Sequence, residues 1–314
     1  MDAPRKKKNR WLRFILFLLF MIWLSIGAYK MIFGRKETII SPIPDTPIVQ
    51  PTQAPKKFTF FQKKKTPDDL AQKINTVIND EWNDYSIVIE DYGSDFALRQ
   101  SEAEIFIAAS INKLPILAAL YYLANKGDID LDDTITLQAA DVQDYGTGSI
   151  RYDKPGTVYS IKTLAKLMIK QSDNTAAYIL ANHTIGFTKL ADLATQWGLT
   201  QTDMVKNNTS NQDIAKLFRM IHDGKITDNA HTQEMLSFLK DTDHETRLPA
   251  KLPDKAITYH KIGTEVGVIH DAGIITDGKT TYYIGIFTKG TAENEQTDAL
   301  MAEVSKVVYE YLSK

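Results

Sequence analysis

The sequence contains no cysteine. This absence excludes disulfide bonds, thiol nucleophiles and cysteine-based metal sites. It does not identify a compartment, because a fold of this size can be stable without disulfides. The 6 histidines are scattered along the chain, and His231 is not part of an H-E-x-x-H zinc motif. We therefore expect neither a metal nor another cofactor.

Positive charge is scarce beyond the N-terminal segment. By count along the sequence, residues 1–66 hold 14 of the 37 Lys and Arg residues but only 3 of the 39 Asp and Glu residues. The other 248 residues therefore hold 23 basic and 36 acidic groups, an excess of 13 negative charges. Such a domain repels phosphates at long range, so we expect no nucleic-acid partner.

The N-terminal segment has the pattern of a membrane anchor. Residues 1–10 are basic, and residues 11–33 form an apolar run interrupted only by Arg13 and Lys30. A spanning helix needs roughly 20 residues, and a basic cluster before it predicts a cytoplasmic N-terminus. A cleaved signal peptide is the alternative, but no small-residue cleavage site is evident. The prediction is a single-pass protein of the cell membrane with an extracellular catalytic domain.

Residues 34–66 read as a linker between this anchor and the remainder of the chain. Proline fixes φ and removes a backbone donor, which keeps such segments extended. The linker is expected to hold residues 67–314 away from the membrane surface. Its prolines are Pro42, Pro44, Pro47, Pro51 and Pro55.

Residues 67–314 show strand patterns at both ends and helical patterns between them. Strands are expected at 85–90, 96–99, 256–262, 268–276 and 281–287, the last two joined by an Asp277-Gly278 hairpin. Helices are expected from Thr66 towards Asp80 and over 108–125, 161–170, 175–182, 187–197, 212–222, 233–239 and 294–312. We predict an α/β (α+β) fold in which helices flank one antiparallel sheet and the helical insert forms a second subdomain. The cleft between them is the expected site.

Three short motifs occur in this order along the domain. They are Ser110-Ile-Asn-Lys113, Ser172-Asp-Asn174 and Lys261-Ile-Gly-Thr264. Each alone has an ordinary structural reading, because serine, aspartate and asparagine cap helices and single lysines are usually solvated. Their order, and their places at helix starts and on a strand, favour a functional reading.

The three motifs and longer stretches around them resemble class A β-lactamases and penicillin-binding proteins, which use S-x-x-K, S-D-N and K-T-G. The resemblance extends over nearly all of residues 67–314 and implies the β-lactamase-like fold with an active-site serine. The stretches that carry it are Ala108–Pro115, Tyr145–Ile150, Pro155–Ser160, Met168–Ala176, Arg247–Pro253 and His270–Ile275.

Ser110, Lys113 and Ser172 are the candidate catalytic residues. Positions three apart share a helix face, so Lys113 can lie beside the Ser110 hydroxyl. A desolvated lysine near other cations gives up its proton more readily and can then take the one from Ser110. Ser172 is expected to relay a proton to the leaving nitrogen.

The remaining candidates are expected to bind substrate. Asn174 would hydrogen-bond a substrate amide, and Lys261 would attract a substrate carboxylate. The resemblance implies an oxyanion hole formed by the backbone N–H groups of Ser110 and Thr264. Gly263 would let substrate lie against the strand edge. Tyr145 is a candidate cleft wall or an ordinary packed aromatic residue.

The sequence also departs from the family pattern. The segment between Trp197 and Asn211, where class A β-lactamases carry a deacylating glutamate, contains no Glu, and Asp203 is its only acid. Ile262 replaces the usual hydroxyl residue, and no arginine follows in the strand just after Gly263. These changes predict an acyl-enzyme that forms and persists.

The first hypothesis is a membrane-anchored serine hydrolase that opens β-lactams, or related peptide or ester bonds, through an acyl-enzyme on Ser110. A low-turnover penicillin-binding protein of the D-Ala-D-Ala peptidase type is the alternative within the class. A binding module for cell-wall fragments without catalysis is the alternative outside it. The natural substrate and the oligomeric state stay open.

Overall fold

The computed structural model describes residues 65–292 and 294–313. The expected basic segment and membrane anchor, and nearly all of the expected linker, lie outside these residues. Within the described ranges, no helix has the length and hydropathy needed to cross a membrane. The predicted domain boundaries stay predictions.

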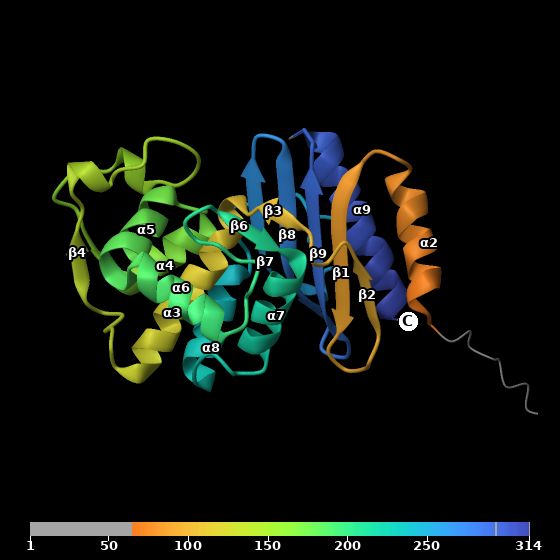
Figure 1. The fold of residues 1–314 in the computed structure, drawn as a ribbon, viewed down its shortest axis with the longest axis horizontal. Helices are drawn as coiled ribbons and strands as arrows, with labels where there is room; N and C mark the ends of the chain where they lie inside the picture. Colours follow the sequence, from red (N-terminus) through yellow and green to blue (C-terminus); the bar gives the residue numbers. More distant parts are fainter. Residues whose placement is uncertain (1–64, 293, 314) are drawn as a thin grey trace, which may run out of the picture. The chain divides into compact units, whose positions relative to one another are not determined.

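Five antiparallel strands form one sheet in the order β2-β1-β9-β8-β7 (Figure 1). The N-terminal part of the domain supplies β1 (Asp84–Asp91) and β2 (Ala97–Gln100). The C-terminal part supplies β7 (Ile257–Glu265), β8 (Val268–Thr276) and β9 (Thr281–Lys289). The turn between β8 and β9 closes with a hydrogen bond from Asp277 N to Thr280 O of 3.2 Å. The prediction of an antiparallel sheet built from both ends is confirmed.

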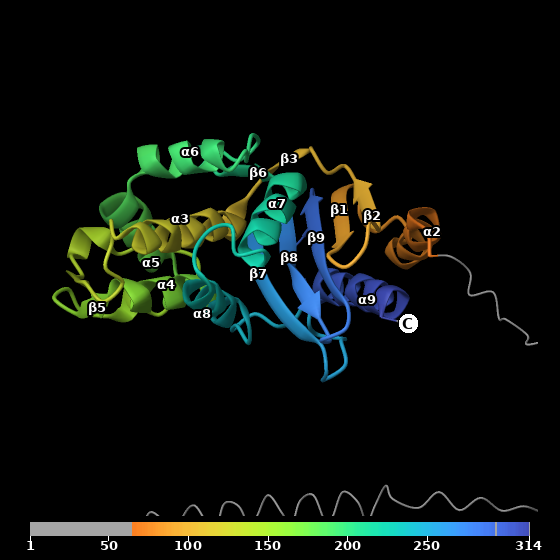
Figure 2. The ribbon, with the colours of Figure 1, turned by 90° about the horizontal axis from the view of Figure 1, so that it is seen from below.

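The helices α2 (Pro67–Ile78) and α9 (Glu295–Leu312) pack together beside one face of this sheet (Figure 2). The Thr66 hydroxyl caps α2 by accepting a hydrogen bond of 3.2 Å from Asp69 N, as the sequence predicts. Leu70 and Ile74, four residues apart, are buried on the face of α2 that meets the sheet. Terminal segments of the domain thus form one layer over the core.

The helical insert lies at the other side of the sheet and is organised around α3 (Lys113–Lys126). Leu114, Leu117 and Tyr121 of α3 are fully buried, because this helix is apolar around most of its circumference and is enclosed by other helices. The surrounding elements are α4 (Ile161–Lys170), α5 (Asn174–Ile179), the π-helical turn Leu180–Ile185, α6 (Phe187–Gln196) and α8 (Asn229–Leu239), whereas α7 (Asn211–His222) packs on the sheet against β1, β8 and β9.

Several boundaries differ from the sequence predictions. The helix expected from Ala108 begins as a 3₁₀ turn, Ala109–Asn112, before α3, because Ala109 has a φ of 47°. Helix α8 starts four residues before the expected Gln233, since the Asp228 side chain accepts from His231 N at 2.9 Å. Short elements were not predicted: β3 (Ile105–Ile107), β4 (Thr134–Thr136), β5 (Val158–Ser160), β6 (Asn208–Ser210), and 3₁₀ turns at Ala139–Asp141 and Ile150–Tyr152.

Candidate active site

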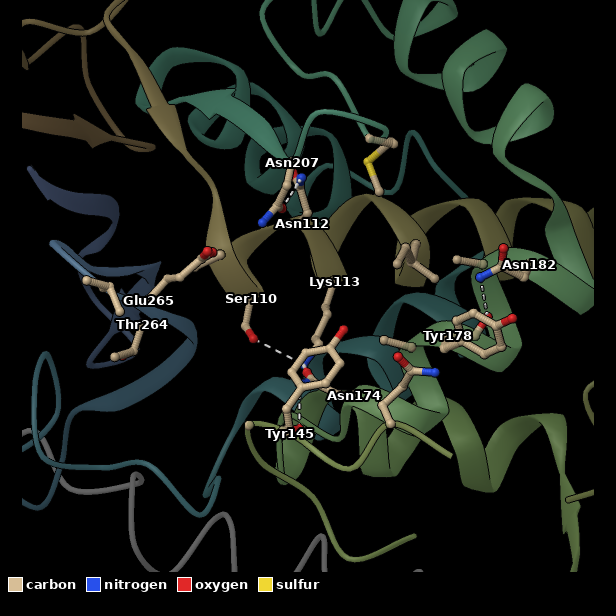
Figure 3. Close-up of a pocket in the computed structure, with 18 of the residues that line it drawn as sticks. Ser110, Asn112, Lys113, Tyr145, Asn174, Tyr178, Asn182, Asn207, Thr264 and Glu265 are labelled. Carbon is tan, nitrogen blue, oxygen red and sulfur yellow. Dashed lines mark hydrogen bonds between the residues drawn. The ribbon is translucent and has the colours of Figure 1, made fainter. Parts of the chain in front are cut away.

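A pocket of about 910 Å³ brings together residues from the sheet, the helical part and the loops (Figure 3). Ser110 lies on the 3₁₀ turn, Lys113 at the start of α3, and Asn174 at the start of α5. Thr264 comes from β7, and Tyr145 comes from the loop before the 3₁₀ turn Ile150–Tyr152. The cleft predicted between the sheet and the helical insert is therefore present.

The backbone around the candidate nucleophile is strained. Ala109, directly before Ser110, has a φ of 47°, and Ser172 has a φ of 55°. Non-glycine residues rarely adopt this left-handed conformation, and it concentrates at functional sites. Because side chains three apart nearly eclipse in a 3₁₀ turn, Lys113 lies directly beside Ser110. Their Nζ and Oγ atoms are 3.0 Å apart.

Lys113 is buried and held by several acceptors. Its Nζ donates to the backbone carbonyl of Ser172 and to Asn174 Oδ1 at 2.7 Å. Burial lowers the pKa of Lys113 to about 7, with the nearby Asp173 charge opposing the shift. A neutral amine has two hydrogens, which these two oxygens can accept. Its lone pair is then available to the Ser110 hydroxyl.

Ser172 connects the two buried lysines. Its Oγ lies 3.1 Å from Lys113 Nζ and 2.9 Å from Lys261 Nζ. Lys261 also donates to the carbonyl of Ile262 at 3.0 Å. Burial first, and the Lys113 charge second, hold the pKa of Lys261 well below its ordinary value. Ser172 therefore lies between the two lysines, and its expected relay of a proton to a leaving nitrogen stays a prediction.

Asn174 is fixed in one amide orientation. Its Oδ1 faces Lys113, and its Nδ2 donates to the carbonyl of Tyr145 at 3.1 Å. Gly146 makes this approach possible, since a Cβ there would lie 2.4 Å from Asn174 Nδ2. The Tyr145 side chain is 63% exposed and lines the pocket. Both residues therefore line the pocket, and the exposed Tyr145 ring forms part of its wall rather than packing in a loop.

Gly263 lies against the nucleophile's own turn. A Cβ at this position would come within 2.9 Å of Ala108 O and of Ile111 Cγ1. This contact gives Gly263 a different role from the expected one of leaving room for substrate. The missing side chain instead lets β7 approach the turn that carries Ser110, while Thr264 lines the pocket.

Arg247 is a residue to which the sequence analysis gave no role. It is only 2% exposed and pairs with Asp298 through a contact of 2.7 Å between Nε and Oδ1. It also donates to Thr264 Oγ1 at 2.8 Å and to His270 O at 2.9 Å. Arg247 therefore braces β7 behind the pocket. The resemblance over Arg247–Pro253 was the only sequence signal for it.

The loop between α6 and β6 contributes no carboxylate to the pocket. Asp203 Oδ1 accepts from Val205 N and Lys206 N, both at 3.0 Å, and these bonds lower the pKa of Asp203. Met204 and Asn207 of this loop line the pocket, whereas Asp203 does not. Among the described residues that line it, Glu265 at the end of β7 is the only acid.

The loop between α6 and β6 is hydrogen-bonded to the 3₁₀ turn that carries Ser110 and to the residue before that turn. Asn207 O accepts from Ala108 N at 2.7 Å, and Asn207 Oδ1 accepts from Asn112 Nδ2 at 2.8 Å. The short antiparallel pairing of β3 with β6 lies directly beside these contacts. The unpredicted strands thus fix the position of Ser110.

Comparisons with known proteins identify the family of this chain. A model of the beta-lactamase enzyme family matches residues 69–312, and the chain belongs to this family. The solved structure of PBP-A is 27% identical with a TM-score of 0.72, covering 78% of this chain and 96% of that one. A PBP-A mutant, solved as an acyl-enzyme complex with penicillin G, is 28% identical with a TM-score of 0.72, covering 78% and 97%.

A beta-lactamase from Sphaerobacter thermophilus DSM 20745 shares the fold at 21% identity, with a TM-score of 0.72 and coverage of 78% of this chain and 96% of that one. A comparison with curated protein sequences found no match. The family match and the shared fold define the protein as a serine hydrolase of the β-lactamase and penicillin-binding type. The predicted family is confirmed.

Proposed function

We propose that the domain acts as a low-turnover penicillin-binding enzyme, in which Ser110 is acylated by β-lactams or cell-wall peptides and the acyl-enzyme persists. The observation that carries the proposal is the 3.0 Å contact between Ser110 Oγ and the Nζ of buried Lys113. Acyl transfer requires a nucleophile within hydrogen-bond reach of a base whose pKa lies near the working pH, and burial lowers the pKa of Lys113 to about 7.

Acylation follows from the contacts around Ser110. Neutral Lys113 takes the hydroxyl proton while Ser110 Oγ bonds to the substrate carbonyl carbon. The carbonyl oxygen then bears negative charge, which the backbone N–H groups of Ser110 and Thr264 would stabilise. When the C–N bond breaks, Ser172 gives its proton to the nitrogen and recovers one from Lys113, since Oγ and Nζ are 3.1 Å apart.

Hydrolysis of the acyl-enzyme needs a base for water, and the described part of the pocket offers none on the loop that faces Ser110. Asp203 engages its own turn and does not line the pocket. The PBP-A mutant whose structure is described as an acyl-enzyme complex with penicillin G supports a stable adduct in a related protein. This combination favours the penicillin-binding protein over a fast β-lactamase.

We also propose that residues 11–33 anchor the enzyme in the cell membrane, with the catalytic domain outside and residues 34–66 as the spacer. The length and hydropathy of this run in the sequence support the proposal. Extraction of cell membranes tests it. The chain should resist high salt and alkaline carbonate and should require detergent, whereas release by carbonate would contradict an integral anchor.

Labelling with a fluorescent penicillin tests the enzymatic proposal. The full chain in detergent should retain the label through denaturing electrophoresis, and peptide mapping should place it on Ser110. Ser110→Ala should carry no label. Ser237→Ala, a serine on the exposed face of α8, is the matched control and should be labelled like the wild type. Label on another residue, or none on the wild type, would contradict the proposal.

A further inference from the structure

Arg151 differs from the other arginines of the described residues in having no carboxylate partner. The other three each form an ion pair: Arg99–Glu90 (2.6 Å), Arg219–Asp223 (3.0 Å) and Arg247–Asp298 (2.7 Å). Arg151 is half-buried and donates from Nη1 to the carbonyl of Gly146 at 2.6 Å. Charged groups that leave water are normally paired. An anionic group from outside the chain is therefore the expected partner of Arg151.

The guanidinium of Arg151 is held in one orientation. Its central carbon lies 4.8 Å from the centroid of the Tyr152 ring, and the bond to Gly146 O fixes one of its edges. Its Nε is buried and has no acceptor among the residues that the structure describes. An unsatisfied buried donor is unusual in a native protein. A planar guanidinium fixed in this way matches a carboxylate, which can accept from two of its donors.

Arg151 lines a pocket of about 370 Å³ that is separate from the one at Ser110. Of the described residues that line the two pockets, Gly146 alone is common to both. We call this the second pocket and define it by the loop Gly146–Ser149 together with Arg151, Tyr152, Gln171, Asp243 and His244. Its volume lies within the range of small-molecule sites, roughly 300–1,000 Å³.

Gln171 supplies the second pocket with a further donor. Its Oε1 accepts from Ser149 N at 3.2 Å and from Ser149 Oγ at 2.7 Å. These two bonds fix the orientation of the amide. The Nε2 group carries two hydrogens, and none of the described residues accepts from it. Gln171 and Arg151 can therefore hold the same carboxylate.

The second pocket also contains an unpaired carboxylate. Asp243 is exposed and forms no ion pair with a described residue, and it is the only acid among the described residues that line this pocket. Burial first, and the Lys261 charge second, lower the pKa of His244, so its ring adds no positive charge at pH 7. One guanidinium and one carboxylate leave the pocket without net charge. This pattern favours a ligand that carries both charges over a simple anion.

We propose that the second pocket binds a small zwitterion, namely an amino acid or a short peptide with a free amine and a free carboxylate. Arg151 and Gln171 would hold the carboxylate, and Asp243 would hold the ammonium group. Such a ligand lies against the loop whose Thr147 Oγ1 donates to Ser172 O at 2.8 Å, so it adjoins the catalytic residues without touching Ser110. The inference does not depend on the proposed function.

Three dipeptide probes that differ only in charge test the second pocket. They are glycylglycine, which carries both charges, N-acetylglycylglycine, which lacks the amine, and glycylglycinamide, which lacks the carboxylate. Titration of the full chain in detergent, followed by ligand-observed NMR, gives the dissociation constant for each probe. Glycylglycine should bind at least about 10-fold more tightly than either derivative, because each derivative loses one charge-assisted contact.

Variants assign each charge of the probe to its partner. In Arg151→Gln, glycylglycine and glycylglycinamide should bind equally, because the carboxylate has lost its partner. In Asp243→Asn, glycylglycine and N-acetylglycylglycine should bind equally. Arg99→Gln and Asp241→Asn make the same substitutions at exposed positions outside the second pocket and should keep the wild-type preferences. Asp243 is exposed, so its variant keeps the test available if Arg151→Gln does not fold.

Absence of binding by all three probes would overturn the second pocket, and so would a preference for glycylglycine that survives in the folded variants. A penicillin adduct on Ser110 should leave the affinity for glycylglycine unchanged within about twofold, because separate sites act independently. Loss of binding in the adduct would place the probe at Ser110 and overturn the inference. If no adduct forms, the proposed function fails, and the titration of the unmodified chain still decides the second pocket.

Discussion

The Nζ atom of Lys113 lies 3.0 Å from the Oγ atom of Ser110. The two carbonyl-type oxygens that hold the amine, Ser172 O and Asn174 Oδ1, would satisfy the two hydrogens of its neutral form. The geometry therefore makes Lys113 a base for Ser110 only when the lysine is unprotonated.

Acylation should accordingly depend on pH. Burial lowers the pKa of Lys113 to about 7, so the fraction of neutral amine rises as pH increases through that value. We expect the rate of acylation by a penicillin to rise about tenfold per pH unit below pH 7 and to level off above about pH 8. This acylation rate is measured between pH 5 and 9 by quenching the reaction at set times and recording the intact mass. Lys113→Arg, which stays protonated, should show almost no acylation, and a flat profile in the wild type would contradict the assignment.

Substitution of Gly263 should disturb the nucleophile. In Gly263→Ala the new Cβ meets Ala108 O and Ile111 Cγ1 at 2.9 Å, so β7 has to move away from the turn. We expect a loss of about 1–3 kcal/mol in the free energy of unfolding and at least about a 10-fold slower acylation. Gly93→Ala is the matched control, since its Cβ has only an ordinary contact of 3.6 Å with Asp91 Oδ1. Equal behaviour of the two variants would argue against the close approach.

Asp203 should have little influence on the lifetime of the adduct. Its carboxylate caps the backbone of Val205 and Lys206, and an asparagine can accept the same bonds. The half-life of the penicillin adduct in Asp203→Asn, followed by mass, should lie within about twofold of the wild type. A half-life lengthened tenfold or more would identify Asp203 as a deacylating base.

The buried His260 should make stability depend on pH. Burial by itself lowers its pKa, but the Asp271 carboxylate at 2.8 Å and the Glu245 carboxylate at 3.2 Å outweigh it and raise the pKa to about 9. A raised folded-state pKa stabilises the fold below pH 6.5, and this contribution is lost as pH rises to about 9.

The comparison with His260→Gln isolates this contribution. Lys113, with its lowered pKa, changes stability in the opposite direction above pH 7, but it does so in both proteins. Urea unfolding at pH 6.5 and pH 9 should show the advantage of the wild type shrinking by roughly 3 kcal/mol. An advantage that stays constant would mean that His260 is not charged in the folded protein.

The parts of this structure that follow local rules could be predicted from the sequence. The Thr66 cap, the Asp277-Gly278 hairpin and the three motifs depend on residues close together in the chain. The site residues Ser110, Lys113, Ser172 and Lys261 could be named because their motifs occur in order. Their meeting point at Ser172 could not be derived, because it depends on how β7 packs against the turn of Ser110.

Other features depend on contacts between distant segments. Arg247 braces Thr264 across 17 positions of sequence, and no local pattern marks that contact. The pairing of β3 with β6 joins residues about a hundred positions apart, and each strand is too short to show periodicity. The role of Gly263 needed the packed structure, since a glycine's sequence position does not say which neighbour approaches it.

The central claim is that Ser110 acylates readily and deacylates slowly. The most direct measurement follows the intact mass of the full chain in detergent with excess penicillin, while the remaining antibiotic is quantified in the same samples. The account predicts one stable adduct per chain, on Ser110, with little antibiotic consumed beyond that stoichiometry. Rapid consumption of antibiotic without a lasting adduct would show an efficient deacylation route and contradict the account.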